Sequence, residues 1–267
     1  MSLKGTLRAM PTLLRVGVSE AVAYRAEMLV WFLSTTMPFI SMALWTAVAR
    51  SSPVGRYDSE DFVRYFLATF TVRQMTGSWV SWQMNYEVRQ GVLSMRLLRP
   101  ISPLWSYAAE NLGYMPMRVV MVLPVVLFSV FQLGAGSLPR TAWGWLFFLL
   151  ALVGGWLVTF LANVAIGTLS LYIESSSRLM DVWYALFLVC SGYLYPVELF
   201  PPALRGALDW MPFRYQIGLP VELMTNAHDF GTALSLLARQ WLWAAGLLIV
   251  SVVSWKRGLK RFGAYGG

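Results

Sequence analysis

Long apolar stretches alternate with short polar links along most of the chain. A helix rises about 1.5 Å per residue, so about 20 apolar residues are enough to cross a hydrocarbon core about 30 Å thick. The pattern predicts an all-α membrane protein with six transmembrane helices, at residues 28–49, 62–82, 115–133, 142–172, 182–199 and 236–255. We expect the whole chain, 1–267, to form one transmembrane domain and Pro38 to kink its first span.

Two other segments show different patterns. In residues 1–27 the apolar positions repeat at helical spacings of three and four, at Leu7, Met10, Leu14, Val18 and Val22. This spacing predicts an amphipathic helix in the membrane interface, or alternatively a simple juxtamembrane extension.

Residues 196–225 mix apolar and aromatic side chains with repeated prolines. Such a segment is typical of a re-entrant element, and we expect it on the extracytoplasmic side before the sixth span.

The composition is typical of an integral membrane protein. The chain is 57% hydrophobic and only 13% charged, whereas a typical soluble domain is about a quarter charged. The formal net charge of +8 does not indicate nucleic acid as a partner, because the basic residues cluster between apolar runs instead of lining one polar face. Twelve of them lie in segments on the N-terminal side and seven on the opposite side. The positive-inside rule therefore predicts that both termini face the cytoplasm.

Candidate chemistry is sparse. The chain has one cysteine, Cys190, and one histidine, His228, so no Cys/His metal cluster or disulfide framework is expected. The sequence has no Ser/His/Asp or H-E-x-x-H pattern, and we assign it no catalytic residue and no cofactor. It also has no phosphate-cradling G-x-x-x-x-G-K-[ST] run. If ATP drives this protein, we therefore expect another subunit to bind and hydrolyse it.

The link at residues 83–104 has a helical apolar face. Its apolar positions are Val88, Val92, Met95 and Leu98, flanked by Glu87, Arg89, Arg96 and Arg99 and followed by Pro100 and Pro103. A short amphipathic cytoplasmic helix of this kind either fits a partner's groove or lies on anionic lipid.

The same link carries the residues of a known family pattern. The runs EVRQGVL at 87–93 and LLRPISP at 97–103 resemble the "ExRxGxLxxxLLRPIS" pattern of permeases in the ABC type-2 exporter superfamily. The predicted architecture also resembles that family along nearly the whole chain, and in particular its branch of paired permeases. The resemblance implies that the link is a coupling helix, held in a groove of a separate ATPase subunit that binds ATP and Mg. It implies that the contact residues are Glu87, Arg89, Gly91 and Arg99.

The resemblance further implies a function and partners. The chain is expected to be the permease subunit of an ATP-binding-cassette exporter, itself not an enzyme, in the bacterial inner (plasma) membrane. It would contact membrane lipids and pair with a second permease, preferably a related but different chain and otherwise a second copy. The alternative is a mechanical subunit that uses ATPase motion to assemble or regulate a membrane complex without carrying substrate. The substrate stays open.

Four further residues are candidates. Glu174 and Arg178 lie in the link between the fourth and fifth spans, which is either a second ATPase contact or only a turn. Arg73 lies inside the second span, where a charge costs about 2.5 kcal/mol or more, so it faces either a translocation path or a structural partner. Glu198 lies at the end of the short fifth span and is a candidate for the outer gate, or for a helix cap.

Overall fold

The computed structural model describes residues 3–134, 137–173 and 176–265, and the regular structure within them is helical. The α-helices in chain order are α1 (Leu3–Ala23), α2 (Arg25–Ser34), α3 (Met37–Ala49), α4 (Ser59–Thr76), α5 (Val80–Arg89), α6 (Val92–Leu97), α7 (Pro103–Gly113), α8 (Met115–Leu133), α9 (Ala142–Thr168), α10 (Ser176–Cys190), α11 (Pro202–Leu208), α12 (Gly218–Met224) and α13 (Phe230–Tyr265). Short 3₁₀ turns occur at Leu169–Leu171, Val197–Leu199 and Arg214–Gln216. The predicted all-α class is confirmed.

Among the described residues, four helical stretches are long and apolar enough to cross a membrane, at Arg25–Ala49, Pro103–Leu133, Ala142–Leu171 and Phe230–Phe262. These stretches contain the first, third and sixth predicted spans and nearly all of the fourth. The second and fifth predicted spans are not among them. The apolar helices support a multi-pass membrane protein, whereas the count of six spans stays a prediction.

The segment predicted as the second span is not one continuous helix. It consists of α4 and α5, which are separated by the non-helical residues 77–79. Helix α4 starts at a capping box, in which the Asp61 backbone N–H donates to Asp58 Oδ1 at 2.8 Å. Its middle is enclosed by the bundle, where Phe66 and Val72 are fully buried. Because other helices surround it, α4 does not need the apolar surface of a lipid-facing span.

Two other predicted spans also differ from continuous helices. The first is interrupted at Thr35 and Thr36, where α2 ends and α3 begins. Pro38 explains this break, because proline lacks an N–H and its ring conflicts with the carbonyl four residues earlier. The kink predicted at Pro38 is thus confirmed. The fifth predicted span stops early, since α10 ends at Cys190 and the chain turns at Gly192, whose φ is +86°.

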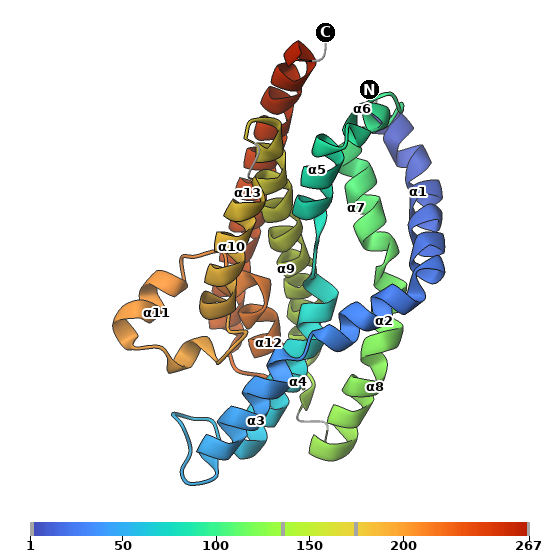
Figure 1. The fold of residues 1–267 in the computed structure, drawn as a ribbon. Helices are drawn as coiled ribbons and strands as arrows, with labels where there is room; N and C mark the ends of the chain where they lie inside the picture. Colours follow the sequence, from blue (N-terminus) through green and yellow to red (C-terminus); the bar gives the residue numbers. More distant parts are fainter. Residues whose placement is uncertain (1–2, 135–136, 174–175, 266–267) are drawn as a thin grey trace.

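Helix α9 is the central element of the bundle and lies against α4, α5, α10, α12 and α13 (Figure 1). Small residues along it allow this close packing. A Cβ added at Gly154 would lie 2.5 Å from Gln240 Oε1 of α13, and one at Gly155 would lie 2.9 Å from the Gln216 carbonyl oxygen. The Gln240 amide Nε2 donates to the Ala151 carbonyl at 2.8 Å, which joins α13 to α9.

The N-terminal helix predicted in residues 1–27 is present as α1, and it packs along α7. The contact requires glycine at position 113, because a Cβ added at Gly113 would lie 2.7 Å from the Gly17 Cα. The start of α1 and the end of α13 lie at the same end of the molecule (Figure 1). The position of α1 relative to a membrane interface, and the side on which the termini lie, stay predictions.

The proline-rich segment forms short elements in the opposite half of the bundle. Helix α11 projects outward, whereas α12 is buried against α4 and α9 (Figure 1). Short helices broken by prolines are what the sequence predicted for residues 196–225. Their depth in a membrane is not tested, so the re-entrant assignment stays a prediction.

The glycine contact between α1 and α7 leads to a stability prediction. Gly113→Ala should lower the free energy of unfolding by about 1–3 kcal/mol, because the added Cβ overlaps backbone atoms that cannot move independently. Thermal unfolding of the purified protein in detergent measures this change. Gly246→Ala in α13 is the matched control, since its Cβ would meet no atom within 4 Å. Equal unfolding temperatures for the two variants would contradict the predicted contact.

Candidate functional site

A cavity of about 850 Å³ lies among the α1–α2, α4–α5 and α7–α8 pairs. Three helix junctions line it, at Tyr24, Gly77 and Tyr114. Interrupted helices leave backbone groups without intrahelical partners, and a membrane protein tolerates them only where protein or a water-filled cavity satisfies those groups. The convergence of three junctions on one cavity marks it as the candidate functional site.

Three arginines line this cavity, namely Arg73, Arg96 and Arg118. Arg118 Nη1 donates to the carbonyl oxygens of Gly77 at 2.7 Å and Gln74 at 3.3 Å, so it caps backbone groups at the end of α4. Arg73 Cζ lies 5.1 Å from the Phe187 ring centroid and 5.8 Å from that of Tyr184, both on α10. These cation–π contacts are structural, yet Arg73 also lines the cavity. The choice between the two roles considered for Arg73 stays a prediction.

Sequence reasoning singled out Arg73 but missed Arg118. The signal was weak, because Arg118 is only the fourth residue of the predicted third span, where a long basic side chain can reach the membrane interface. Its relation to Arg73 could not be read from the sequence. Only the packing of α8 against α4 brings the two residues to the same cavity.

A largely buried polar network lines part of the cavity through Arg96 and Glu110. Arg96 Nη2 lies 2.7 Å from Glu87 Oε1, and Arg96 Nη1 lies 2.5 Å from Glu110 Oε1. The Tyr107 hydroxyl donates to Glu87 Oε2 at 2.6 Å. Burial alone would lower the pKa of Arg96, but Glu110 and Glu87 together raise that pKa above its ordinary value. The guanidinium therefore stays charged and ties α6 to both α5 and α7.

The segment predicted as one coupling helix is divided. Helix α5 ends at Arg89, Gly91 has a φ of +72°, and α6 follows. Within α6 and just after it, Met95 is 68% exposed and Leu98 is 81% exposed, whereas Leu93 is buried. The turn at Gly91 thus leads into a short helix with one anchored side and one exposed apolar side.

The four residues implied as ATPase contacts do not share one environment. Arg89, Gly91 and Arg99 are exposed at the surface of the segment. Glu87 is only 5% exposed and belongs to the buried network with Arg96. The sequence did not predict this buried position, because the charged residues on either side of the apolar face of the predicted helix all appear suited to the surface.

The second predicted contact is described only in part. Arg178 is exposed in the first turn of α10, whereas Glu174 lies outside the described residues. Helix α10 is joined to α5 through a buried hydrogen bond, in which Asn85 Nδ2 donates to Ser176 Oγ at 2.6 Å. The start of α10 is therefore fixed against the same helix that leads to α6.

Glu198 lies in a second polar cluster near the opposite end. Its Oε2 is 2.6 Å from Arg56 Nε and accepts from the Tyr57 hydroxyl at 3.2 Å. Burial, reinforced by Glu198, raises the pKa of the Tyr57 phenol well above its ordinary value, although Arg56 opposes this. Tyr57 therefore stays protonated and can donate. The carboxylate joins the loop after α3 to the loop after α10.

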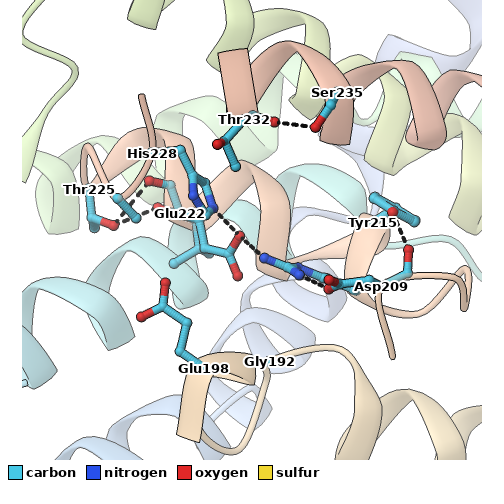
Figure 2. A network of polar contacts seen from close by, with 12 residues as sticks. Gly192, Glu198, Asp209, Tyr215, Glu222, Thr225, His228, Thr232 and Ser235 are labelled. Carbon is cyan, nitrogen blue, oxygen red and sulfur yellow. Dashed lines mark hydrogen bonds and ion pairs between the residues drawn. The ribbon is translucent and has the colours of Figure 1, made fainter. Parts of the chain in front are cut away.

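A deeper ion-pair network lies within the proline-rich segment (Figure 2). Arg214 pairs with Asp209 and, at 2.8 Å through Nη2, with Glu222 Oε2. His228 Nε2 lies 2.8 Å from the same Glu222 oxygen. The chain positions of these residues gave no signal of a cluster, because the turns at the prolines decide which side chains meet.

The four long apolar helical stretches define a multi-pass α-helical membrane protein. A model of the family described as ABC-2 family transporter protein matches residues 29–266. The chain belongs to the ABC-2 transporter family, and the resemblance seen in the sequence is confirmed. A search of curated proteins gave no match. Membership indicates a permease-type transport protein rather than a catalytic enzyme, in a family whose permeases generally work with an ATPase subunit.

Removal of the central arginine of the network at α6 should be costly. Arg96→Ala leaves Glu87 buried without its cation, and the loss of one partner of a buried pair costs about 3–5 kcal/mol. Unfolding in detergent by heat or denaturant measures the change. Arg99→Ala, at an exposed position in the same segment, should shift stability by less than about 0.5 kcal/mol. A loss of similar size in both variants would contradict the structural role of Arg96.

Glu222 should be similarly critical in the proline-rich segment. Glu222→Gln removes the negative charge from a buried site beside Arg214 and should lower the unfolding free energy by about 3–5 kcal/mol. Glu60→Gln is the matched control, because Glu60 pairs with Arg64 near the surface, where such pairs contribute about 0–1 kcal/mol. The comparison uses thermal unfolding near neutral pH. If Glu222→Gln is no less stable than Glu60→Gln, the network does not stabilise this segment.

Proposed function

We propose that this chain is the permease subunit of an ATP-binding-cassette exporter and is driven by a separate ATPase that holds ATP and Mg. The family match over residues 29–266 carries the proposal. The exposed apolar residues Met95 and Leu98 support it, because water-exposed apolar side chains on a short helical segment suit a partner's groove.

The coupling path is proposed to run through α5. Arg96 joins α6 to Glu87 of α5 and Glu110 of α7, so a displacement of α6 acts on both helices. Helix α5 begins directly after the break at residues 77–79, which lines the cavity. Motion imposed on α6 by closure of the ATPase would therefore reach the cavity through one short helix.

The residues take distinct roles in this proposal. The exposed Arg89, Gly91 and Arg99 contact the ATPase, and Glu87 positions the segment from within. Arg178, together with Glu174, forms a second contact. Arg73 lies on the translocation path, and Glu198 holds the outer gate through its ion pair with Arg56.

The assembly proposed is a pair of permeases with the ATPase, in the bacterial inner (plasma) membrane with both termini in the cytoplasm. A related but different chain is the preferred second permease. The start of α1 and the end of α13 lie at one end of the molecule, which supports a common side for the termini (Figure 1).

The test is copurification with the ATPase. Leu98→Ser should reduce the nucleotide-binding ATPase recovered with the tagged chain by about tenfold or more, since truncation of an interface anchor costs about 2 kcal/mol or more. Leu204→Ser is the matched control, because Leu204 is also exposed but belongs to α11. Recovery is measured by quantitative mass spectrometry after mild detergent extraction from the native membrane.

The outcomes separate the candidate functions. Undiminished ATPase recovery with Leu98→Ser, or equal loss with Leu204→Ser, would contradict the assigned coupling surface. Absence of any ATPase from the wild-type preparation would overturn the exporter proposal. ATP hydrolysis that only a protein partner stimulates would favour the mechanical alternative over export.

A further inference from the structure

The geometry points to an anionic headgroup bound by Arg73 and Arg118, and we propose that the cavity takes an amphiphile that carries a phosphate or carboxylate. The description of this molecule as cargo rests on the proposed export function. Its binding does not, because the cavity is formed by this chain alone.

The first observation is uncompensated positive charge. Within the described part of the chain, no carboxylate forms an ion pair with Arg73 or Arg118. Arg118 contacts backbone carbonyls and Arg73 contacts aromatic rings, and neither kind of partner carries a negative charge. Charged groups at membrane depth are costly unless paired, so two such guanidinium groups at one cavity favour an anion that is supplied from outside the chain.

The acidic residues of the lining do not form ion pairs with these two arginines. Glu110 is occupied by Arg96 and by Gln83, whose Nε2 donates to Glu110 Oε2 at 2.8 Å. Glu20 and Glu27 belong to α1 and α2, on either side of the Tyr24 junction. Among the described residues, neither Glu20 nor Glu27 forms an ion pair with Arg73 or Arg118.

A third donor adjoins the arginines. Gln74 follows Arg73 on α4 and lines the cavity, and its buried Nε2 has no acceptor among the described residues. A buried donor without a partner loses the hydrogen bonds that it makes in water, which is unfavourable. A phosphate or carboxylate oxygen would satisfy this donor as well as the guanidinium groups.

The rest of the lining favours an amphiphile over a small soluble anion. Trp31, Trp79 and Trp82 line the same cavity and offer large apolar surfaces. Two of the helices that form it, α2 and α8, expose Val30 and Val120, which suit contact with acyl chains. The cavity therefore adjoins lipid-facing surfaces, where an anionic headgroup can enter while its chains stay in the bilayer.

The test measures lipid retention by the full-length purified chain. Native mass spectrometry compares bound phosphatidylglycerol with phosphatidylcholine of the same acyl chains. We expect wild type to prefer phosphatidylglycerol by at least about tenfold, and Arg73→Gln to lose most of that preference, because a charge-assisted hydrogen bond contributes about a factor of ten or more. Arg50→Gln is the matched control, since Arg50 is an exposed basic residue outside the cavity lining.

A second variant separates anion binding by Arg118 from its hydrogen bonds to backbone carbonyls. Arg118→Gln removes the cap on the end of α4 and endangers folding, whereas Arg118→Lys keeps the charge and should keep the lipid preference. Equal retention of the two lipids by wild type would overturn the proposal, as would unchanged preference in Arg73→Gln. If inorganic phosphate at millimolar concentration displaces phosphatidylglycerol, the proposal of an amphiphilic ligand is wrong and the site binds a soluble anion. Because the chain is tested without an ATPase, failure here leaves the copurification test of the export function unaffected.

Discussion

The interruption between α4 and α5 shapes both halves of this bundle. A helix that ends among other helices leaves its last carbonyl groups without partners, and lipid cannot supply donors. Arg118 supplies them from α8, with Nη1 2.7 Å from the Gly77 carbonyl oxygen. The satisfied break lets α4 stay buried in one half of the bundle and α5 extend toward α6 in the other. The cavity and the position of α6 both depend on this division.

Close packing around α9 holds the divided helices in place. Gly167 of α9 lies against α5, where an added Cβ would be 2.9 Å from Met84 Sδ. Without a hydrophobic driving force between helices in lipid, such small-residue contacts are a main source of helix association. The broken helices therefore gain their stability from a long helix that contacts both of them.

The two ends of the molecule use buried charge differently. Near α6, Arg96 is shared between Glu87 and Glu110 and joins three helices. In the proline-rich segment, Glu222 is shared by Arg214 and His228 (Figure 2). Each network is stable only while all its members stay together, because separation leaves a buried charge without a partner. Such networks resist small distortions, and they suit elements that must move as units.

Hydropathy, proline chemistry and one local run of residues were enough to predict the all-α membrane class, the kink at Pro38 and the family, and four of the six predicted spans coincide with long apolar helical stretches. The break after Thr76 could not be predicted, since Gly77 and Ser78 are common within membrane helices. Glu87 was predicted as a surface contact, although it is buried against Arg96 and Tyr107. The cavity that brings Arg73 and Arg118 together and both ion-pair networks exist only in the folded chain. Most of their members lie on different helices, and no local pattern encodes which helix faces meet.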